Sequence, residues 1–401
     1  MPLVEVLAGI EKNGVKLNLK LLGELAKETD QELKLLEKNI YKAVGQEFNI
    51  SSPLQLKEIL FEKLKISTLG IGKTKTGIST AAGELEKLRG QHKVIDLILD
   101  FRELAKLKST YLDALPKLIN KKDNRVHTSF NQTVTATGRL SSSNPNLQNI
   151  PIRTKRGQKI RKTFIAESGY KILKADYSQL ELRIIASLAN DKNMLEAFES
   201  KVDIHTKTAA AINDIKIDEV TPKLRRQAKE INFGVLYGMG AWGLAQRTGI
   251  SNQEAKKFID KYFATYKEVK KYLDETIVVA RDKGYVETFY GRRRYLAEIN
   301  SSIQQVRSSA ERMAMNMPIQ GTEADLIKLA MVAIHQKLPK ISPQTKMIMQ
   351  VHDELVFEVP QDDIEKVARL IENTMNEVYK LRAPIETEIE VGSNWGATEK
   401  I

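Results

Sequence analysis

The chain has 401 residues with 42% hydrophobic side chains, which predicts two or three subdomains with buried cores. Lysine and arginine outnumber aspartate and glutamate by 63 to 51, and the resulting charge of +12 favours a polyanionic partner such as nucleic acid without requiring one. Cysteine is absent, which excludes disulfides and thiolate zinc sites, and no apolar run could span a bilayer, so we expect a cytoplasmic protein without membrane partners.

Two helical segments with a basic connection are predicted in the first third of the chain. Leucines at helical spacing form an apolar stripe over residues 21–36, and leucines and isoleucines form a second over residues 85–107. The connection at 69–83 is rich in glycine and threonine and carries Lys73 and Lys75. We expect two long helices joined across a basic tip, with a plain helical hairpin without function as the alternative.

Two glycine-containing runs resemble nucleotide-binding motifs and are rejected on their context. Residues 72–74 read Gly-Lys-Thr, like the end of a P-loop, but Ser67 stands where the first glycine belongs and no strand precedes it. Glycines 238, 240 and 243 fit G-x-G-x-x-G, but they follow a helical segment rather than a strand. The sequence therefore predicts neither a P-loop ATPase nor a dinucleotide-binding fold.

The remaining elements alternate between strand and helix patterns. A strand is predicted at 171–176, followed by a helix at 179–190. The region 202–338 is mostly helical by its period. Apolar runs at 346–352 and 355–359 predict a hairpin with acidic residues at its turn, and a last helix at 362–379 precedes a strand at 385–391.

Asp176 ends the first predicted strand, and Asp353 lies in the turn of the hairpin. Carboxylates at buried strand ends are costly unless they are neutralised, and a divalent metal ion is the common remedy. Two such carboxylates brought together could hold two Mg²⁺ ions roughly 3.5–4 Å apart, as in-line phosphoryl transfer uses them. The alternative is that both are solvated turn aspartates.

A stripe of four side chains on the predicted helix at 221–238 favours nucleotide binding. Arg225, Lys229, Phe233 and Tyr237 recur every four residues and share one helix face. The cationic half offers charge to a triphosphate, and the aromatic half offers flat rings to a base. The alternative is that the aromatic rings are core residues and the cations are solvated.

Five segments of the chain form an ordered set. They are Thr137-Gly-Arg-Leu-Ser-Ser-Ser-Asn-Pro-Asn-Leu-Gln-Asn-Ile-Pro151, Asp176-Tyr-Ser-Gln-Leu-Glu-Leu-Arg183, Arg225-Arg-Gln-Ala-Lys-Glu-Ile-Asn-Phe-Gly-Val-Leu-Tyr-Gly238, Met317-Pro-Ile-Gln-Gly-Thr322 and Gln350-Val-His-Asp-Glu354. The second, third and fifth resemble the three polymerase motifs of the A family of DNA polymerases, most of all its Klenow-like bacterial members, and the other two are further matching stretches. The likeness runs over nearly the whole chain, from about residue 3 to 395.

The resemblance implies an α+β, helix-rich fold shaped as a right hand. Residues 18–122 would form a helical-hairpin thumb, residues 200–314 helical fingers, and residues 1–17, 123–199 and 315–401 a palm with an antiparallel sheet. The implied activity is template-directed addition of deoxynucleotides to a primer 3′-hydroxyl with release of pyrophosphate. The implied partners are primer–template DNA, dNTPs and two Mg²⁺ ions, for which Mn²⁺ is expected to substitute. A monomer is expected in a bacterial cytoplasm or nucleoid, with no exonuclease activity in this chain.

The resemblance also implies roles for single residues around the nucleotide. Asp176 and Asp353 would bind both metals with the carbonyl of Tyr177, and Lys229 would donate a proton to pyrophosphate. Glu181 would crowd the sugar 2′ position, Phe233 would pack on the sugar and base, and Tyr237 would stack at the templating position. The other implied contacts to the nucleotide come from Gln179, His205 and Arg225.

Contacts to DNA are implied for a second group of residues. These are Arg139, Trp242, Arg312, Asn316, Gln320, His352 and the tip lysines Lys73 and Lys75. The role of Glu354, next to Asp353, is left open. Gly240 and Trp242 depart from the serine and phenylalanine of the family pattern, although tryptophan keeps an aromatic ring for the template strand.

Three other classes of protein would share some of these features. An RNA polymerase or a reverse transcriptase would share the two aspartates, but Glu181 and the region of Gln320 favour a DNA polymerase. A metal-dependent nuclease would not need the stripe that begins at Arg225. A non-catalytic DNA-binding protein would explain the charge but would leave Asp176 and Asp353 without a purpose.

Overall fold

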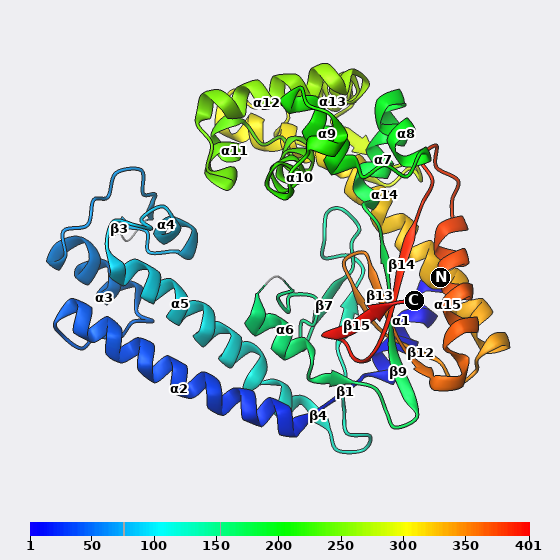
Figure 1. The fold of residues 1–401 in the computed structure, drawn as a ribbon, viewed down its shortest axis with the longest axis horizontal. Coiled ribbons are helices and arrows are strands. Elements are labelled where there is room, and N and C mark those ends of the chain that lie inside the picture. Colours follow the sequence, from blue (N-terminus) through cyan, green and yellow to red (C-terminus); the bar gives the residue numbers. More distant parts are fainter. Residues whose placement is uncertain (75–76, 153) are drawn as a thin grey trace.

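The computed structural model describes residues 1–74, 77–152 and 154–401, and its ribbon has the outline of an open C (Figure 1). A central sheet lies on one side, a long helical arm extends from its base, and a group of helices lies above it. None of the helices in these described ranges is both long and apolar enough to cross a membrane.

The central sheet has nine strands in the order β12-β13-β9-β14-β8-β1-β5-β4, with β15 paired to β14. Neighbouring strands pair antiparallel, as predicted for the palm. The strands are β1 (Val15–Leu17), β4 (Ile119–Asn120), β5 (Arg125–Val126), β8 (Phe164–Ile165), β9 (Tyr170–Tyr177), β12 (Lys346–Val351), β13 (Glu354–Pro360), β14 (Thr387–Asn394) and β15 (Ala397–Lys400).

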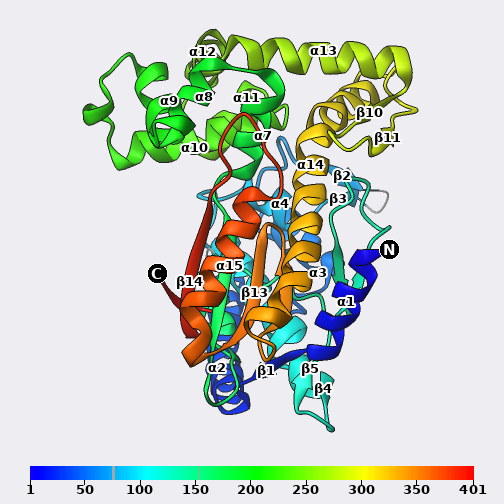
Figure 2. The same cartoon turned by 90° about the vertical axis from the view of Figure 1, so that its right-hand side faces the viewer.

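Both faces of the sheet are buried, which explains why its middle strands read as apolar runs. Successive residues of β9 point to opposite faces, so Ile172 joins one hydrophobic core and Leu173 the other. The core around Leu173 lies under helices α14 (Gln304–Ile341) and α15 (Ile364–Glu377), which cover one face in Figure 2. The opposite core contains Ile172 and Trp395 and lies at the base of the arm.

The helical arm is built on α2 (Leu19–Val44) and α5 (Lys93–Leu107), which pack along each other. The second apolar stripe does not form one continuous helix, because Gly90 has a positive φ and the chain turns before α5 begins. The tip has a separate small core and further elements: α3 (Pro53–Lys57), η1 (Glu58–Lys63), β2 (Lys73–Thr74), β3 (Gly77–Ile78) and α4 (Ala82–Glu86). Lys75 lies outside the described residues.

The helices above the sheet confirm the prediction that the middle of the chain is mostly helical. They are α7 (Leu180–Ala189), α8 (Lys192–Glu199), α9 (Ile204–Asn213), α10 (Pro222–Leu236), α11 (Ala241–Thr248), α12 (Asn252–Thr265) and α13 (Lys267–Lys283). The hairpin β10 (Tyr285–Glu287) and β11 (Arg293–Tyr295) follows α13 and precedes α14. Helices α7 and α8 pack against α13 and α9, although the predicted boundary at residue 199 assigns them to the palm.

Short elements complete the chain. They are α1 (Pro2–Asn13), η2 (Lys108–Leu112), η3 (Leu115–Leu118), β6 (Ser129–Asn131), β7 (Ser141–Ser143), α6 (Lys155–Arg161), η4 (Ile217–Glu219) and η5 (Gln361–Asp363). The longest described helix, α14, runs from the upper helices down along the sheet (Figure 2). It therefore connects the group of upper helices with the sheet.

Candidate active site

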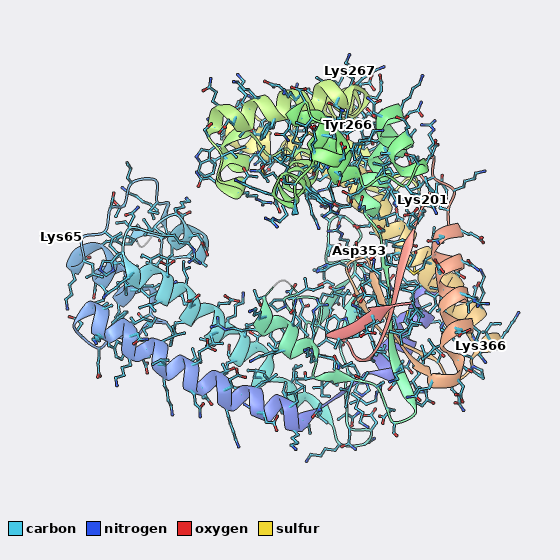
Figure 3. All side chains as sticks on the ribbon, in the orientation of Figure 1. Lys65, Lys201, Tyr266, Lys267, Asp353 and Lys366 are labelled. Carbon is cyan, nitrogen blue, oxygen red and sulfur yellow. The ribbon has the colours of Figure 1, made fainter. Side chains whose placement is uncertain are left out.

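Strand pairing brings Asp176 and Asp353 together. In the register of β9 and β13, Glu354 lies opposite Asp176, so Asp353 in the adjoining turn falls beside the end of β9. The turn is tight because His352 adopts a positive φ of 57°. Figure 3 shows Asp353 at the end of the sheet that faces the upper helices. The predicted hairpin with an acidic turn is confirmed.

Burial acts on both carboxylates, and repulsion by neighbouring carboxylates acts further on Asp176. Burial, and then the neighbouring Asp353 and Glu354, raise the pKa of Asp176 to about 8. Burial likewise raises the pKa of Asp353, whose carboxylate lies within hydrogen-bonding distance of that of Asp176. Two such groups cannot both carry a charge without a cation between them. Their oxygen atoms are the donors that Mg²⁺ prefers, so the pair fits a divalent metal ion.

Side-chain ligands for such an ion are few. Within the described part of the chain, no group of three or more histidine, aspartate or glutamate side chains is placed to hold a metal. Glu354, whose role was left open, does not line the pocket beside the aspartates. Its carboxylate accepts a hydrogen bond of 2.7 Å from Nε1 of Trp395 and lies 4.0 Å from Nζ of Lys174. Further ligands would therefore be backbone carbonyls, water or substrate oxygens.

A pocket of about 650 Å³ lies between the two aspartates and helix α10. It unites residues from the sheet ends, α7, α9, α10 and α14, which are far apart in the sequence. Those predicted as site residues are Arg139, Asp176, Tyr177, Gln179, Glu181, His205, Arg225, Lys229, Phe233, Tyr237, His352 and Asp353. The lining residues that were not predicted are Ser178, Leu180, Glu230, Arg247, Glu323 and Glu388.

Helix α10 presents the predicted stripe to this pocket. The hydroxyl of Thr221 accepts a hydrogen bond from the N–H of Leu224 and caps the helix. Asp203 binds Arg225 through two hydrogen bonds, of 3.0 Å to Nε and 2.8 Å to Nη2. Burial alone would raise the pKa of Asp203, but hydrogen bonds from Arg225 and Thr206 outweigh it and lower the pKa to about 2. Arg225 is thus held by a charged partner at the pocket wall.

His205 of α9 forms an aromatic pair with Phe233, a member of the stripe on α10. Their ring centroids lie 5.8 Å apart, and Nδ1 of His205 lies 2.9 Å from the side-chain amide nitrogen of Asn232. Burial lowers the pKa of His205 to about 4, and the cations Lys229 and Arg225 act in the same direction. The imidazole is therefore neutral at pH 7, and with Nδ1 accepting from Asn232 its proton is on Nε2.

Glu181 is the centre of a hydrogen-bonded network on the other side of the pocket. Its Oε1 accepts a hydrogen bond of 2.7 Å from Nη2 of Arg139, and its Oε2 accepts one from the hydroxyl of Tyr237. Gln320 also makes a hydrogen bond with Tyr237. The pKa of Tyr237 is raised, first by burial and then by the charge of Glu181. Tyr237 and Glu181 are thus fixed relative to each other at the end of α10.

The other predicted DNA contacts that the structure describes lie outside this pocket. Arg312 and Asn316 lie one turn apart on α14. Arg312 packs on Gly238, where an added Cβ would lie 2.8 Å from its Cγ, and Oδ1 of Asn316 is buried without a partner among the described residues. Trp242 on α11 is 63% exposed, and Lys73 lies on the exposed hairpin of the arm.

Comparison with known proteins reveals a family. The model of DNA polymerase family A matches residues 19–397. The chain is 48% identical over 394 residues to the thermostable DNA polymerase I of Thermus filiformis, covering 98% of this chain and 47% of that protein. It is 48% identical over 396 residues to the DNA polymerase I of Bacillus caldotenax, covering 98% and 45%. The chain spans about half the length of these relatives.

A solved structure agrees with the fold. It is the POL domain of Pol1 from M. smegmatis, in complex with DNA primer-template and dNTP, which covers 99% of this chain and 70% of its own. The two match with a TM-score of 0.93 at 41% sequence identity. The predicted helix-rich right-hand fold is confirmed. On its sequence and on its fold, the chain belongs to DNA polymerase family A.

Proposed function

We propose that this chain is a template-directed DNA polymerase, which adds deoxynucleoside monophosphates from dNTPs to a primer 3′-hydroxyl and releases pyrophosphate. The observation that carries the proposal is the single pocket that joins Asp176 and Asp353 to the stripe on α10. A nuclease would use the two aspartates without the stripe. The POL domain of M. smegmatis Pol1, which shares the fold, is in complex with DNA primer-template and dNTP, the substrates proposed for this chain.

Polymerases of this family require a divalent metal ion. For this chain we propose two Mg²⁺ ions, held by Asp176, Asp353 and the carbonyl of Tyr177, with Mn²⁺ able to substitute. When bound, they would lower the pKa of the primer hydroxyl and offset the charge of the α-phosphate and the leaving pyrophosphate. The raised pKa values of the two aspartates support the assignment, because the buried pair is electrostatically incomplete without a cation.

The chain's own side chains bind and orient the nucleotide. Arg225, Lys229 and the Nε2 proton of His205 would contact the triphosphate, with Lys229 as the proton donor to pyrophosphate. Phe233 would pack on the sugar and base, and Gln179 also lines the pocket. Each of these side chains lies in the pocket that contains the aspartates.

Glu181 and Tyr237 would define the sugar and the template position. The carboxylate of Glu181, fixed between Arg139 and Tyr237, would crowd a 2′-hydroxyl and so exclude ribonucleotides. Tyr237 would stack at the templating position. Contacts with the DNA would come from Arg139, Trp242, Arg312, Asn316, Gln320, His352, Lys73 and Lys75.

We assign the arm at residues 18–122 to the thumb, residues 200–314 to the fingers, and residues 1–17, 123–199 and 315–401 to the palm. The protein would act as a monomer on primer–template DNA, in a bacterial cytoplasm or nucleoid. The test is single-nucleotide extension of a primed template with Mg²⁺ and one complementary dNTP. A primer ending in a dideoxynucleotide is the matched control and should not be extended. Shortening of the primer without extension would favour the nuclease instead.

A further inference from the structure

Glu323 is a buried carboxylate in the wall of the pocket that no matching motif includes. It lies on α14, one turn after Gln320, and only 6% of its side chain is exposed. Burying a carboxylate is costly unless it is paired and hydrogen-bonded. Glu323 therefore calls for an explanation that the resemblance to polymerases does not supply.

Glu323 accepts two hydrogen bonds from one edge of the Arg139 guanidinium. Oε2 of Glu323 accepts a hydrogen bond of 3.0 Å from Nε and a second from Nη2. The same Nη2 donates to Oε1 of Glu181 over 2.7 Å. Nη1, at the other edge, has no hydrogen-bond partner in the described ranges, and the Arg139 side chain remains 33% exposed. The guanidinium is therefore held at its Nε and Nη2 edge, and its Nη1 edge is available to bind another group.

The network carries two carboxylates for one guanidinium. Burial, and then the charge of Glu181, raise the pKa of Glu323 to about 8, while Arg139 opposes the shift. Burial opposes the positive charge of Arg139, but Glu323 and Glu181 outweigh it and raise its pKa. The guanidinium is thus confined by its hydrogen bonds to both side chains, because turning it away would leave the buried oxygen atoms of Glu323 without a donor.

We infer that Glu323 is a positioning residue for Arg139, which it orients so that Nη1 faces the primer–template, and that it acts on Glu181 through the shared Nη2. The inference rests on the proposed function, because the DNA contact of Arg139 is part of that function. Helix α14 provides a rigid base for the arrangement, since it packs against α7 and α15 and shares a hydrophobic core with β9. Glu323 would not touch the substrate itself.

A double-mutant cycle tests this role. The rate of single-nucleotide extension, as kcat/KM for the primer–template, is measured for the wild type, Glu323→Ala, Arg139→Ala and the double variant. A hydrogen bond to a charged group corresponds to roughly a tenfold change or more, so Glu323→Ala should lower kcat/KM by about tenfold. In the Arg139→Ala background, removal of Glu323 should have no further effect.

Two more substitutions separate positioning from packing. Glu323→Gln keeps an oxygen that can accept from Nε and should recover most of the lost rate, whereas Glu323→Met fills the volume without an acceptor and should not. If Glu323→Ala does not fold, Glu323→Met replaces it in the cycle. Discrimination against ribonucleotides should weaken in the same variants that lose rate, because Glu181 shares Nη2 of Arg139.

Asp325 on the same helix is the matched control. It is similarly buried, but it pairs with Arg292 and Thr288 and does not line the pocket. Asp325→Ala should lower the melting temperature, and its effect on rate should multiply with that of Arg139→Ala. The same multiplication for Glu323→Ala, or an unchanged rate, would overturn the inference and leave Glu323 as a packing residue. A wild type that does not extend primers would instead overturn the proposed function.

Discussion

The backbone N–H of Tyr177 lies 3.4 Å from the carbonyl oxygen of Asp353, which joins the end of β9 to the turn between β12 and β13. The adjoining register pairs Asp176 with Glu354 across the same strands. Both aspartates are therefore placed by backbone hydrogen bonds rather than by their own side chains. Replacing either carboxylate should leave the geometry of the backbone intact.

The first prediction follows from this geometry. Asp176→Ala or Asp353→Ala should abolish primer extension while the affinity for primer–template changes little, because the carboxylates act on metal ions rather than on the duplex. Extension and equilibrium DNA binding are measured on the same preparations. Glu354→Gln is the control, since Glu354 accepts its hydrogen bond from Trp395 outside the pocket and should retain measurable extension. Substantial turnover in either aspartate variant would contradict the two-metal assignment.

Glu181→Ala should admit ribonucleotides more readily, with some loss of overall rate, because the carboxylate no longer crowds the 2′ position. Tyr237→Phe removes the hydroxyl that donates to Glu181, so it should relax the same discrimination to a smaller extent. The ratio of dNTP to rNTP incorporation efficiency is measured on one template. Unaltered discrimination in Glu181→Ala would mean that another side chain excludes the ribose.

Phe233→Tyr should improve the use of dideoxynucleotides. A dideoxynucleotide lacks the 3′-hydroxyl beside the triphosphate, and the phenol of tyrosine would supply an oxygen near the vacated place. A hydrogen bond to a charged group is worth roughly 1.5–3 kcal/mol, or about a ten- to hundredfold change in selectivity. The ratio of dNTP to ddNTP incorporation should fall accordingly. A ratio that does not fall would mean that the Phe233 ring serves the packing against His205 alone.

Lysines of the arm tip should contribute to the salt dependence of DNA binding. Replacing Lys73 and Lys75 with alanine should reduce the slope of log affinity against log salt by up to about 2, since each phosphate contact contributes about 0.9. The double variant should also make shorter extension products than the wild type. The paired control replaces Lys201 and Lys366, which lie away from the arm in Figure 3. If the two double variants have equal slopes of log affinity against log salt, the arm tip does not bind DNA and only connects the two helices.

His205 should make the protein less stable in acid. Its pKa is lowered from 6.5 to about 4 in the folded state, so the unfolded chain takes up a proton that the folded chain does not. This contribution to stability is complete above about pH 6.5 and is lost as the pH falls towards 4, by roughly 3 kcal/mol. His205→Gln, which cannot titrate, should show a flatter decline in melting temperature over that range. Parallel curves for the two proteins would contradict a buried neutral imidazole.

The elements of the site could be predicted from the sequence because their patterns are local. The strand ending at Asp176, the hairpin around Asp353 and the stripe on α10 each depend on side chains within a few residues of one another. A period of two or of 3.6 residues determines which side chains share a face. The break before α5 was missed because the apolar stripe continues in register across the turn at Gly90.

Glu323 and Glu354 show what only the tertiary structure decided. Glu323 follows one matching segment and Glu354 ends another, and no local pattern says that the first faces the pocket whereas the second turns towards Trp395. The contact between Arg139 and Glu323 joins residues 184 positions apart, and its formation depends on how α14 packs over the core that it shares with β9. The sequence by itself determined the chemistry that each element carries. The packing of distant elements determined which charges meet, because a buried charge takes its partner from whatever side chain the fold brings within hydrogen-bonding distance.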